Sequence, residues 1–370
     1  MQCNFYSSIA EIPATTWNDL FDSENPFVQH AFLLALEASG CVSPATGWHA
    51  QHMVLTEAGQ PMAVLPLYAK NHSYGEFVFD WGWAEAYQRH GLDYYPKLLT
   101  AIPFSPVAGP RVGVRPGADT DVVFEALLSA LHQLAALHDY SSWHLLFPGR
   151  RLQSALLNMR EEGAFLHREA VQFHWFNHGY ATFDDFLATL RSSRRKNLKR
   201  ERRMVAEQGV TVERKPGMQI SDAEWEGFYQ CYMSTYRKRS GHDGYLNRGF
   251  FDQLRDAMPE KLMLVVAGRD GKIVASSLFL HDSKQLYGRY WGALQDVSCL
   301  HFEACFYQGI EFCIERGLQK FDPGTQGEHK LMRGFEPVKS ASYHWIADHR
   351  FRAAIADFLS HEKRSTDRYQ

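Results

Sequence analysis

The chain has 370 residues, of which 45% are hydrophobic and 22% charged, with a formal net charge of −3. This length predicts about two domains, and the composition is that of a globular protein rather than a disordered or fibrous one. The weak negative charge excludes a wholly basic surface for nucleic acid or anionic membrane, but a local basic patch remains compatible with it.

The first residues carry no basic segment followed by an apolar one, and no apolar run reaches the roughly 20 residues that span a bilayer. The cysteines show no CxxC spacing, and no HExxH motif is present. We therefore expect a cytoplasmic protein with reduced thiols, no transmembrane segment and no metal site.

Residues 53–82 contain two β-rich runs joined by a Gly-bearing turn, then a polar loop and an aromatic run that ends in Trp-Gly. This pattern predicts an antiparallel meander of three strands. An aromatic zone stiffened by prolines follows over 79–112, and long structured loops are often functional. Its amphipathic side chains either pack between loops or bind substrate, and the substrate-binding candidates are Tyr94, Tyr95, Lys97 and Arg111.

Helical spacing of apolar residues predicts a helix near 120–138, and WHLLF after it predicts a buried strand. Further along, residues 191–203 (RSSRRKNLKRERR) hold eight basic residues and one acidic residue. The preceding TFDDF supplies a cap and an acidic first turn, so we predict a basic helix over 184–208. Its cationic face is either solvated or binds phosphate, of RNA or of a nucleotide-linked substrate, through Arg194, Arg195 and Lys199.

The pattern of 53–82 returns at 263–292 and is followed, in the same order, by a helix near 299–316 and a strand, LQKFD. An ordered series of matches is hard to obtain by chance, so we infer a duplicated unit. Each copy should be a mixed sheet covered by helices. The predicted domains are 1–178 and 179–348, with a C-terminal helix at 349–370.

The two copies differ most at 321–335, FDPGTQGEHKLMRGF, where the first copy has an ordinary apolar helix. Asp322 ends a buried strand, where ligands of α/β sheets gather, and a helix starting near residue 327 would present free N–H groups to an anion. Lys330 or His329 would stabilise charge on a carbonyl oxygen, although a solvated turn is the alternative. Further candidates here for substrate binding are Gln326 and Glu328.

The stretch YGRYWGALQDVSCLHFE at 287–303 supplies the remaining candidates. Arg289 and Tyr290 lie on a predicted strand and are substrate-binding candidates. His301 opens the next helix and is either a surface residue or a general base that works near neutral pH. Asp322 is the second candidate for the general base that takes the proton of the amine.

The duplicated unit, the basic helix and GTQGEHKLMRGFEP (324–337) together resemble the Fem-type branch of the GNAT acyltransferase superfamily, more narrowly the bacterial FemAB-like, or peptidoglycan-biosynthesis, N-acyltransferases. YYPKLLTAIPFSPVAGPR (94–111) fits the same group, and the resemblance covers about residues 25–360. It implies an α/β (α+β) fold of tandem GNAT-like domains, each a mixed, mostly antiparallel sheet flanked by helices. It also implies transfer of an acyl or aminoacyl group to an amine.

In characterised Fem-type relatives the donor is an aminoacyl-tRNA and the acceptor is a peptidoglycan precursor. GNAT enzymes that use acetyl-CoA carry a Q/RxxGxG/A loop, and here Arg289 and Gly292 are kept but Leu294 stands where Gly or Ala belongs. We therefore expect a Fem-type N-acyltransferase that needs no cofactor, although acyl-CoA could replace aminoacyl-tRNA as the donor. Two further hypotheses are an acetyl-CoA-dependent small-molecule N-acetyltransferase and a non-catalytic protein that binds tRNA or nucleotides.

Overall fold

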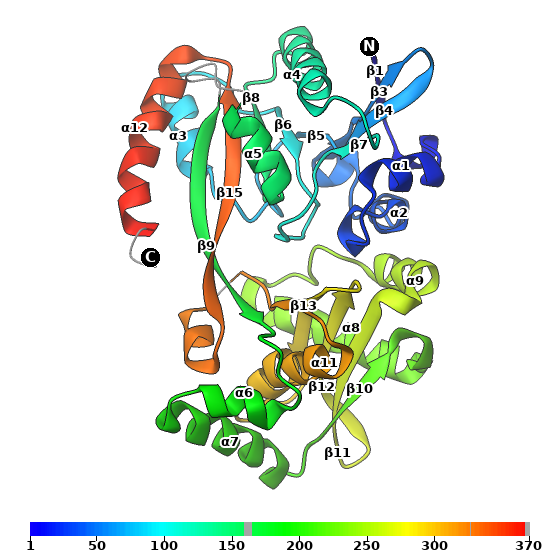
Figure 1. Ribbon diagram of the computed structural model, residues 1–370, viewed down its shortest axis with the longest axis vertical. Coiled ribbons are helices and arrows are strands. Elements are labelled where there is room, and N and C mark those ends of the chain that lie inside the picture. Colours follow the sequence, from blue (N-terminus) through cyan, green and yellow to red (C-terminus); the bar gives the residue numbers. More distant parts are fainter. Residues whose placement is uncertain (159–164, 326, 367–370) are drawn as a thin grey trace. The chain divides into compact units, whose positions relative to one another are not determined.

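The computed structural model describes residues 1–158, 165–325 and 327–366 and divides the chain into two compact units (Figure 1). Unit 1 comprises Met1–Val171 with Lys339–Gln370, and unit 2 comprises Gln172–Val338. The chain passes between the units inside β9 (Leu166–Phe176) and inside β15 (Glu336–Ile346). The predicted domain boundaries follow the sequence repeat and stay a prediction, whereas the compact units follow packing and place the last helix with unit 1.

Unit 1 contains strands of two sheets and six α-helices among its described residues. Besides parts of β9 and β15, its strands are β1 (Gln2–Tyr6), β2 (Trp48–Ala50), β3 (His52–Glu57), β4 (Gln60–Leu65), β5 (Tyr68–Lys70), β6 (Lys97–Thr100), β7 (Gly113–Val114) and β8 (Ser142–Leu146). Its helices are α1 (Ala14–Phe21), α2 (His30–Ala38), α3 (Trp81–Arg89), α4 (Thr120–Leu137), α5 (Arg150–Asn158) and α12 (His349–Thr366), together with the 3-10 turns Ile9–Glu11, Pro26–Val28 and Pro44–Thr46.

The described strands of unit 2 belong to one sheet. Its strands are β10 (Thr211–Pro216), β11 (Leu262–Arg269), β12 (Lys272–His281), β13 (Gln285–Ala293) and β14 (Lys320–Asp322). Its helices are α6 (Phe183–Thr189), α7 (Ser192–Glu207), α8 (Asp222–Ser240), α9 (Arg248–Ala257), α10 (Leu300–Phe302), the π segment Glu303–Tyr307, α11 (Gln308–Arg316) and the 3-10 turns Gly217–Gln219, Pro259–Lys261 and Glu328–Arg333.

The two units repeat one order of strand pairings, which agrees with the inferred duplication. In unit 2, β11, β12 and β13 are successive antiparallel neighbours, β13 pairs with β14 in parallel, and β14 pairs with the end of β9 antiparallel. In unit 1, β2, β5 and β6 are antiparallel neighbours, β6 pairs with β8 in parallel, and β8 pairs with β15 antiparallel. Each set is thus completed by a strand that enters from the other half of the sequence.

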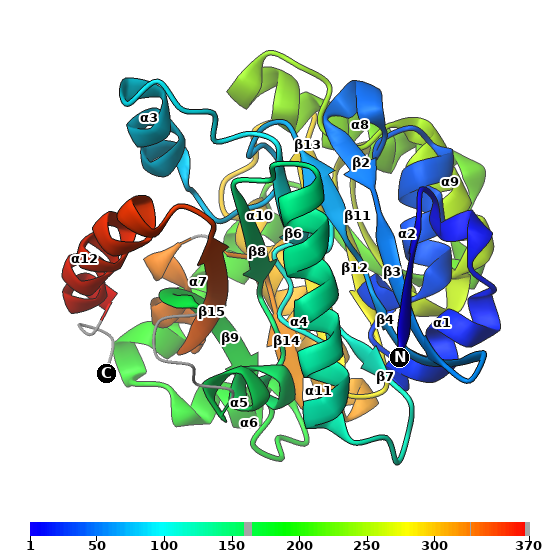
Figure 2. The same cartoon turned by 90° about the horizontal axis from the view of Figure 1, so that it is seen from above.

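One predicted strand of unit 1 is wrong. The aromatic third strand that the sequence predicts at 76–82 is a loop that runs into α3 (Figure 2). The third strand is instead β6, about twenty residues later in the chain. The loop adopts irregular backbone because two of its carboxylates, Glu76 and Asp80, are buried against Lys97.

Local capping explains where the helices of unit 2 begin and end. Thr182 and Asp185 form a capping box at the start of α6, and Ser221 and Glu224 form another at the start of α8. The predicted basic helix over 184–208 is two helices, because the backbone at Leu190 is extended (ψ 149°) and separates α6 from α7. The expected helices near 120–138 and 299–316 are confirmed, the second with a π segment inside it.

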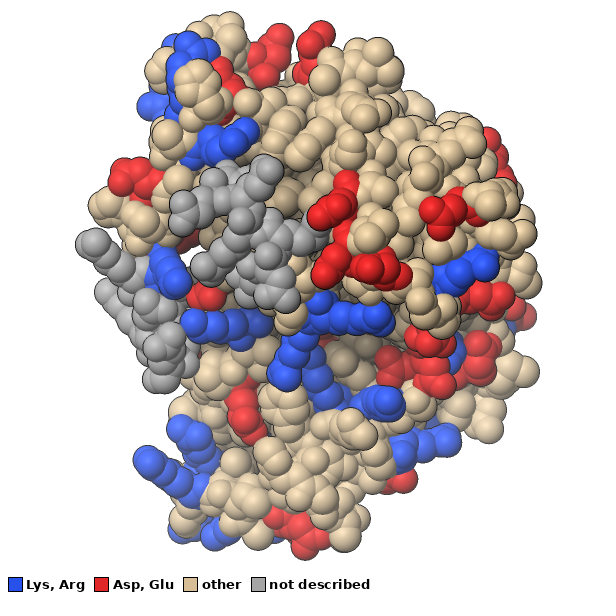
Figure 3. All heavy atoms as spheres, turned by 45° about the horizontal axis from the view of Figure 1, so that its top comes forward, with Lys and Arg blue, Asp and Glu red and all other residues tan. Residues whose placement is uncertain are grey.

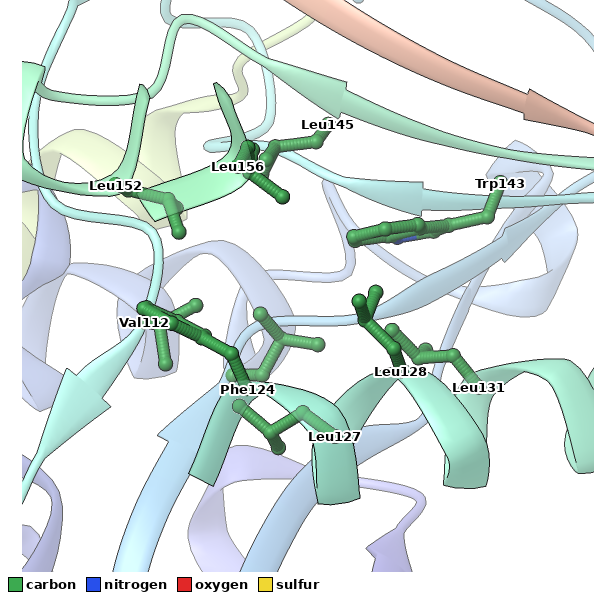
Figure 4. Close-up of a pocket in the computed structure, with 10 residues that line it drawn as sticks. Val112, Phe124, Leu127, Leu128, Leu131, Trp143, Leu145, Leu152 and Leu156 are labelled. Carbon is green, nitrogen blue, oxygen red and sulfur yellow. The ribbon is translucent and has the colours of Figure 1, made fainter. Parts of the chain in front are cut away.

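The core of unit 1 lies between its sheet and helices α4 and α5. By length and composition alone α4 is apolar enough to cross a membrane, as core helices also can be, and a third of its residues are buried inside the protein. The expected absence of a transmembrane segment stays a prediction. A small apolar cavity of about 20 Å³ remains beneath it (Figure 4). It is lined by Leu, Phe, Val and Trp side chains only and has room for about one water molecule, so we treat it as a packing gap rather than a ligand site.

Candidate active site

The parallel strands β13 and β14 pair over only three residues, from Gln285 opposite Lys320 to Tyr287 opposite Asp322. At that point β14 ends, while β13 continues to Ala293. The last six residues of β13 therefore have no strand on that edge within the described chain, and the segment after β14 lies next to them. A side chain at Gly324 would place its Cβ 3.7 Å from the carbonyl oxygen of Gly288.

A β-bulge marks the same point of β13. Leu278 of β12 is opposite Tyr290 and Phe279 is opposite Gly288, so Arg289 is the extra residue. Its guanidinium binds Asp322 with a 2.6 Å contact, and both side chains are almost fully buried. Bulges are common beside active sites because they re-aim a side chain.

The carboxylate of Asp322 accepts hydrogen bonds from several donors. Its Oδ1 accepts the N–H of Gly324 at 2.9 Å and lies 3.6 Å from Nε2 of His174. Burial alone would raise the pKa of Asp322, but Arg289, His174 and the Gly324 N–H outweigh it and hold the pKa well below its usual value. A carboxylate held in this state is a weak base, so its evident task is to fix Arg289 and the turn at Gly324.

Lys330 lies on the 3-10 turn Glu328–Arg333, which takes the place of the expected α-helix, and is 2% exposed. Its ammonium donates a hydrogen bond to the carbonyl oxygen of Gly324 at 2.5 Å. Burial lowers the pKa of Lys330 to about 8, against the opposing effect of Asp322 and with help from Arg289. A lysine tuned near neutral pH can both donate and accept a proton, which is what general acid–base chemistry requires.

His301 and His329 belong to an aromatic cluster beside this turn. The ring of His329 lies 5.8 Å from Phe302 and 5.7 Å from Phe306, and His301 lies 5.3 Å from Phe306. Part of the His301 ring is exposed, yet desolvation by its neighbours, together with the charges of His329, Arg239 and Lys330, lowers its pKa to about 4. Desolvation also lowers the pKa of His329, so both imidazoles are neutral at pH 7, with little basicity at His301.

A buried ion pair holds the Lys330 turn in place. Arg333 donates to Glu201 of α7, at 2.7 Å from Nη2 and 3.2 Å from Nε, and its Nη1 donates to the carbonyl oxygen of His329. Tyr307, from the π segment, donates to the same carboxylate. The Arg333 guanidinium also lies 3.4 Å above the ring of Phe302. Three elements, α7, α10 and the π segment, thus converge on one turn, and π segments often occur at functional sites.

The predicted phosphate-binding residues of α7 are placed differently from one another. Arg194 is half-buried and donates to the carbonyl oxygen of Leu331 at 3.3 Å, and Arg195 is half-buried beside it. Lys199 is exposed and forms an ion pair with Asp184 at 2.9 Å. Basic side chains gather in small groups among acidic ones on the face shown in Figure 3, so the net charge does not hide one large basic surface there.

The predicted residues of unit 1 form a buried network. Lys97 donates to Ser73, Glu76 and Asp80 at 2.5–2.8 Å, and Tyr94 donates to Asp80 at 2.6 Å. The hydroxyl of Tyr95 lies 2.8 Å from that of Ser73. Arg111 is buried and donates to the carbonyl oxygens of Val107, Pro110 and Leu146. All four predicted residues thus bind parts of unit 1, which gives them a structural task.

The remaining candidates are Tyr290 of β13, Glu328 at the start of the Lys330 turn, and Gln326. Tyr290 is buried between aromatic rings, 6.0 Å from Tyr232 and 5.2 Å from Phe251. Glu328 is not buried, and Gln326 lies outside the described residues. The structure therefore brings Lys330, Asp322 and Arg289 together, with His301 and His329 in the adjoining aromatic cluster.

Sequence reasoning missed two members of this site, His174 and Glu201. His174 comes from β9, far from the motif in the sequence, and burial lowers its pKa to about 4. Glu201 is the one acidic residue of the basic run 191–203, and a lone charge of opposite sign on a helix that docks on the protein is a usable signal for a buried partner. No comparable signal marks His174.

The loop after β13 bears on the acyl donor. The N–H groups of Leu294 and Gln295 donate to the carbonyl oxygen of Val274, and that of Ser298 donates to the side chain of Gln208. Gly292 is required by packing, because a Cβ there would lie 1.7 Å from the carbonyl oxygen of Cys231. These backbone donors, which a pyrophosphate would need, are already occupied by the protein itself.

Solved structures with a similar fold include FemX (14% identity, 85% of this chain and 92% of that chain, TM-score 0.50). Others are the C-terminal domain of a putative lysylphosphatidylglycerol synthetase from Agrobacterium fabrum (12%, 95% and 96%, TM-score 0.55) and L-PGS from Bacillus licheniformis (12%, 89% and 96%, TM-score 0.50). At such identities the likeness shows the fold alone, and with the strand pairings of the two units it confirms the expected class of mixed, mostly antiparallel sheets flanked by helices. A comparison with curated proteins gives no match.

The comparison with family models shows the family of the chain as well as its fold. Residues 8–370 match the model of the FemAB-like family, described as peptidoglycan biosynthesis/recognition. This range includes both sequence copies, the basic helix and the Lys330 turn. The chain therefore belongs to the FemAB-like family.

Proposed function

We propose that this protein is an N-acyltransferase of the Fem type that transfers an acyl or aminoacyl group from an activated donor to an amine, and that the acceptor is a cell-wall precursor. One observation carries the proposal: a buried lysine with a pKa of about 8 at the open edge of β13, in a member of the FemAB-like family. The free thiols of all six cysteines agree with a cytoplasmic location.

In the proposed reaction the acceptor amine attacks the activated carbonyl carbon. A C–N bond forms, the bond from that carbon to the leaving group breaks, and the amine loses a proton. Lys330, as the ammonium, donates a hydrogen bond to the oxygen that becomes negative in the tetrahedral intermediate. The amine's proton passes to the leaving group through neutral His329, which lies on the same 3-10 turn as Lys330.

Two features support aminoacyl-tRNA as the donor over acyl-CoA. The N–H groups of Leu294, Gln295 and Ser298 are occupied internally, which takes away donors that would hold the pyrophosphate of coenzyme A. In addition, α7 presents exposed cations, among them Lys196, Lys199 and Arg200, that suit the phosphates of a tRNA backbone. Binding of tRNA through this helix is part of the proposal.

The test compares Lys330→Ala with the control Lys284→Ala, an exposed lysine in the β12–β13 turn. Transfer is measured by mass spectrometry of an amine acceptor supplied with charged tRNA or with acetyl-CoA. We expect Lys330→Ala to lose about 10²–10³-fold in rate and the control to keep its rate. Unchanged turnover in Lys330→Ala removes this lysine from the mechanism, and turnover with acetyl-CoA alone reverses the order of donors.

A further inference from the structure

A groove of about 550 Å³ opens on unit 1 and shares no lining residue with the candidate active site of unit 2. Its walls are the end of β1 with the residues after it, the end of α2, the 3-10 turn at Pro44, and β2. Its volume is in the range of ordinary ligand sites. Among the residues that line it are Tyr6, Ser8, Glu37, His49, Ala50 and Gln51.

The groove lies along an unused strand edge. β2 and β3 form one extended run that is interrupted only at Gln51, and β5 and β4 form the opposite arm of the same hairpin (Figure 2). On the outer edge of this run, β1 pairs with β3 as far as Tyr6 opposite His52. Beyond Tyr6 the chain turns away into the 3-10 turn Ile9–Glu11, so no strand pairs with β2 on that edge within the described residues.

The register shows which backbone groups face outward. Gly47 accepts from Asn71 and Gln51 donates to Leu67, so the odd-numbered residues of this stretch bond to the β5 arm. In an antiparallel ladder the residues between them point the other way. The N–H of Trp48 accordingly donates to Ser43 across the edge, whereas the N–H and C=O of Ala50 face outward with no partner among the described residues.

The carboxylate of Glu37 keeps this edge open. It accepts from the hydroxyl of Ser8 at 2.8 Å and from the N–H of Ile9 at 2.9 Å, which pulls the chain off the line of β1. Its second oxygen lies 2.6 Å from the ring of His52. The acceptor on the walls is thus the Glu37 carboxylate, because the side chain of Gln51 is turned to the core, where its amide donates to the hydroxyl of Tyr140 at 2.8 Å.

We propose that this groove binds an extended peptide, which adds to the open edge of β2 in line with β1 and directs an amine-bearing side chain toward Glu37. The peptide donates to and accepts from Ala50, and about three of its residues fit along β2. Burial would raise the pKa of the Glu37 carboxyl, but His52, Ser8 and the N–H of Ile9 outweigh it and lower that pKa, so the wall carries a carboxylate, which favours a cationic ligand. The inference does not rest on the proposed function.

The probe is the blocked tripeptide acetyl-Val-Lys-Val-amide, titrated into the full chain and followed by the amide signals of ¹⁵N-alanine-labelled protein. Two matched peptides accompany it. One has Glu in place of Lys, and the other has a methyl group on the backbone nitrogen of the lysine. We expect the Ala50 signal to move, and each matched peptide to bind at least tenfold more weakly. Equal binding of the three peptides, or an Ala50 signal that stays in place, overturns the proposal.

The protein variants are Ala50→Pro and its control Ala50→Ser. Proline removes the outward N–H at an edge where it makes no bond to β5, so the fold should survive, and serine keeps that N–H. Thermal melting checks the fold. Peptide binding should be lost in Ala50→Pro and kept in Ala50→Ser, and a folded Ala50→Pro that binds normally contradicts the inference. If Ala50→Pro does not fold, the methylated peptide decides the question.

Discussion

Lys97 in unit 1 and Lys330 in unit 2 are both buried, but their ammonium groups have different partners. Lys97 donates to a hydroxyl and two carboxylates, whereas the described contact of the Lys330 ammonium is one carbonyl oxygen. Burial lowers the pKa of both, yet Asp80 and Glu76 outweigh it at Lys97 and raise that pKa above its ordinary value. The charge of Lys97 is therefore needed by the fold, and that of Lys330 is a cost to the fold.

This difference explains how one duplicated architecture holds a structural centre in one unit and a reactive candidate in the other. In unit 2 the carboxylate that acts on the Lys330 ammonium, Asp322, is neutralised by Arg289. Lys330 is left with too little negative charge to offset its desolvation. In unit 1 no arginine competes in this way in the described contacts of Glu76 and Asp80.

The largest effect should come from Lys97→Met. This change leaves Glu76 and Asp80 buried without their shared cation, and breaking a buried pair in this way costs about 3–5 kcal/mol. Chemical denaturation at pH 7 measures the loss in the free energy of unfolding. A loss below about 1 kcal/mol would mean that water or another group replaces the ammonium and that the contrast between the two lysines is false.

Lys330→Met should have the opposite sign. The pKa of Lys330 is about 8 in the folded protein and 10.5 in the ordinary state, a difference worth about 3 kcal/mol. The lost hydrogen bond to Gly324 offsets about 1 kcal/mol, so we expect the variant to be about 1–3 kcal/mol more stable at pH 7.

The pH dependence of this gain follows from the direction of the shift. Between about pH 8 and 10.5 the unfolded chain binds more protons at Lys330 than the folded chain, so the stability of the wild type rises with pH there. The advantage of Lys330→Met is full below about pH 8 and absent above 10.5. Denaturation curves at about pH 7 and 10 compare the two proteins, and a constant difference contradicts the assigned pKa.

Glu201→Gln tests what positions the Lys330 turn. The amide keeps the shape of Glu201 but removes the charge that pairs with buried Arg333, and we expect a loss of about 1–3 kcal/mol. A shift in the pKa of Lys330, measured by NMR of the ¹³C-methylated amine, distinguishes positioning from general destabilisation. An unchanged lysine signal would assign Glu201 to the fold alone.

The smallest effect is expected at the exposed ion pair of Lys199 and Asp184. Surface pairs of this kind contribute about 0–1 kcal/mol, so Lys199→Ala should change stability by less than about 0.5 kcal/mol. Binding of tRNA, measured at two salt concentrations, is the more sensitive readout for this residue. A stability loss above about 1 kcal/mol would show that the α6–α7 corner is a structural element in its own right.

Much of the fold was predictable because its signals are local. Alternation, turn residues and capping predicted the second meander, α4, β8 and β14. The prediction failed at 76–82, where an aromatic run with strand character forms a loop because Glu76 and Asp80 are bound to Lys97. It also missed the break at Leu190 that divides the basic helix.

The candidate site was predictable only in part. The turn chemistry of 321–335 pointed to Lys330 and Asp322, and the strand pattern pointed to Arg289. The same reasoning selected Lys97 and Arg111, which the structure uses to hold loops, because a sequence does not say whether a cation faces carboxylates or an open edge.

The sequence by itself determined that a unit was doubled, in what order its strands and helices follow, and that the later copy concentrates polar groups after β14. These features depend on spacing and turn chemistry within a few neighbouring residues. The tertiary structure alone decided which charges are paired, because partners such as Glu201 and Arg333 are 132 residues apart. Desolvation and pairing set a side chain's pKa, and both arise only when distant segments pack together.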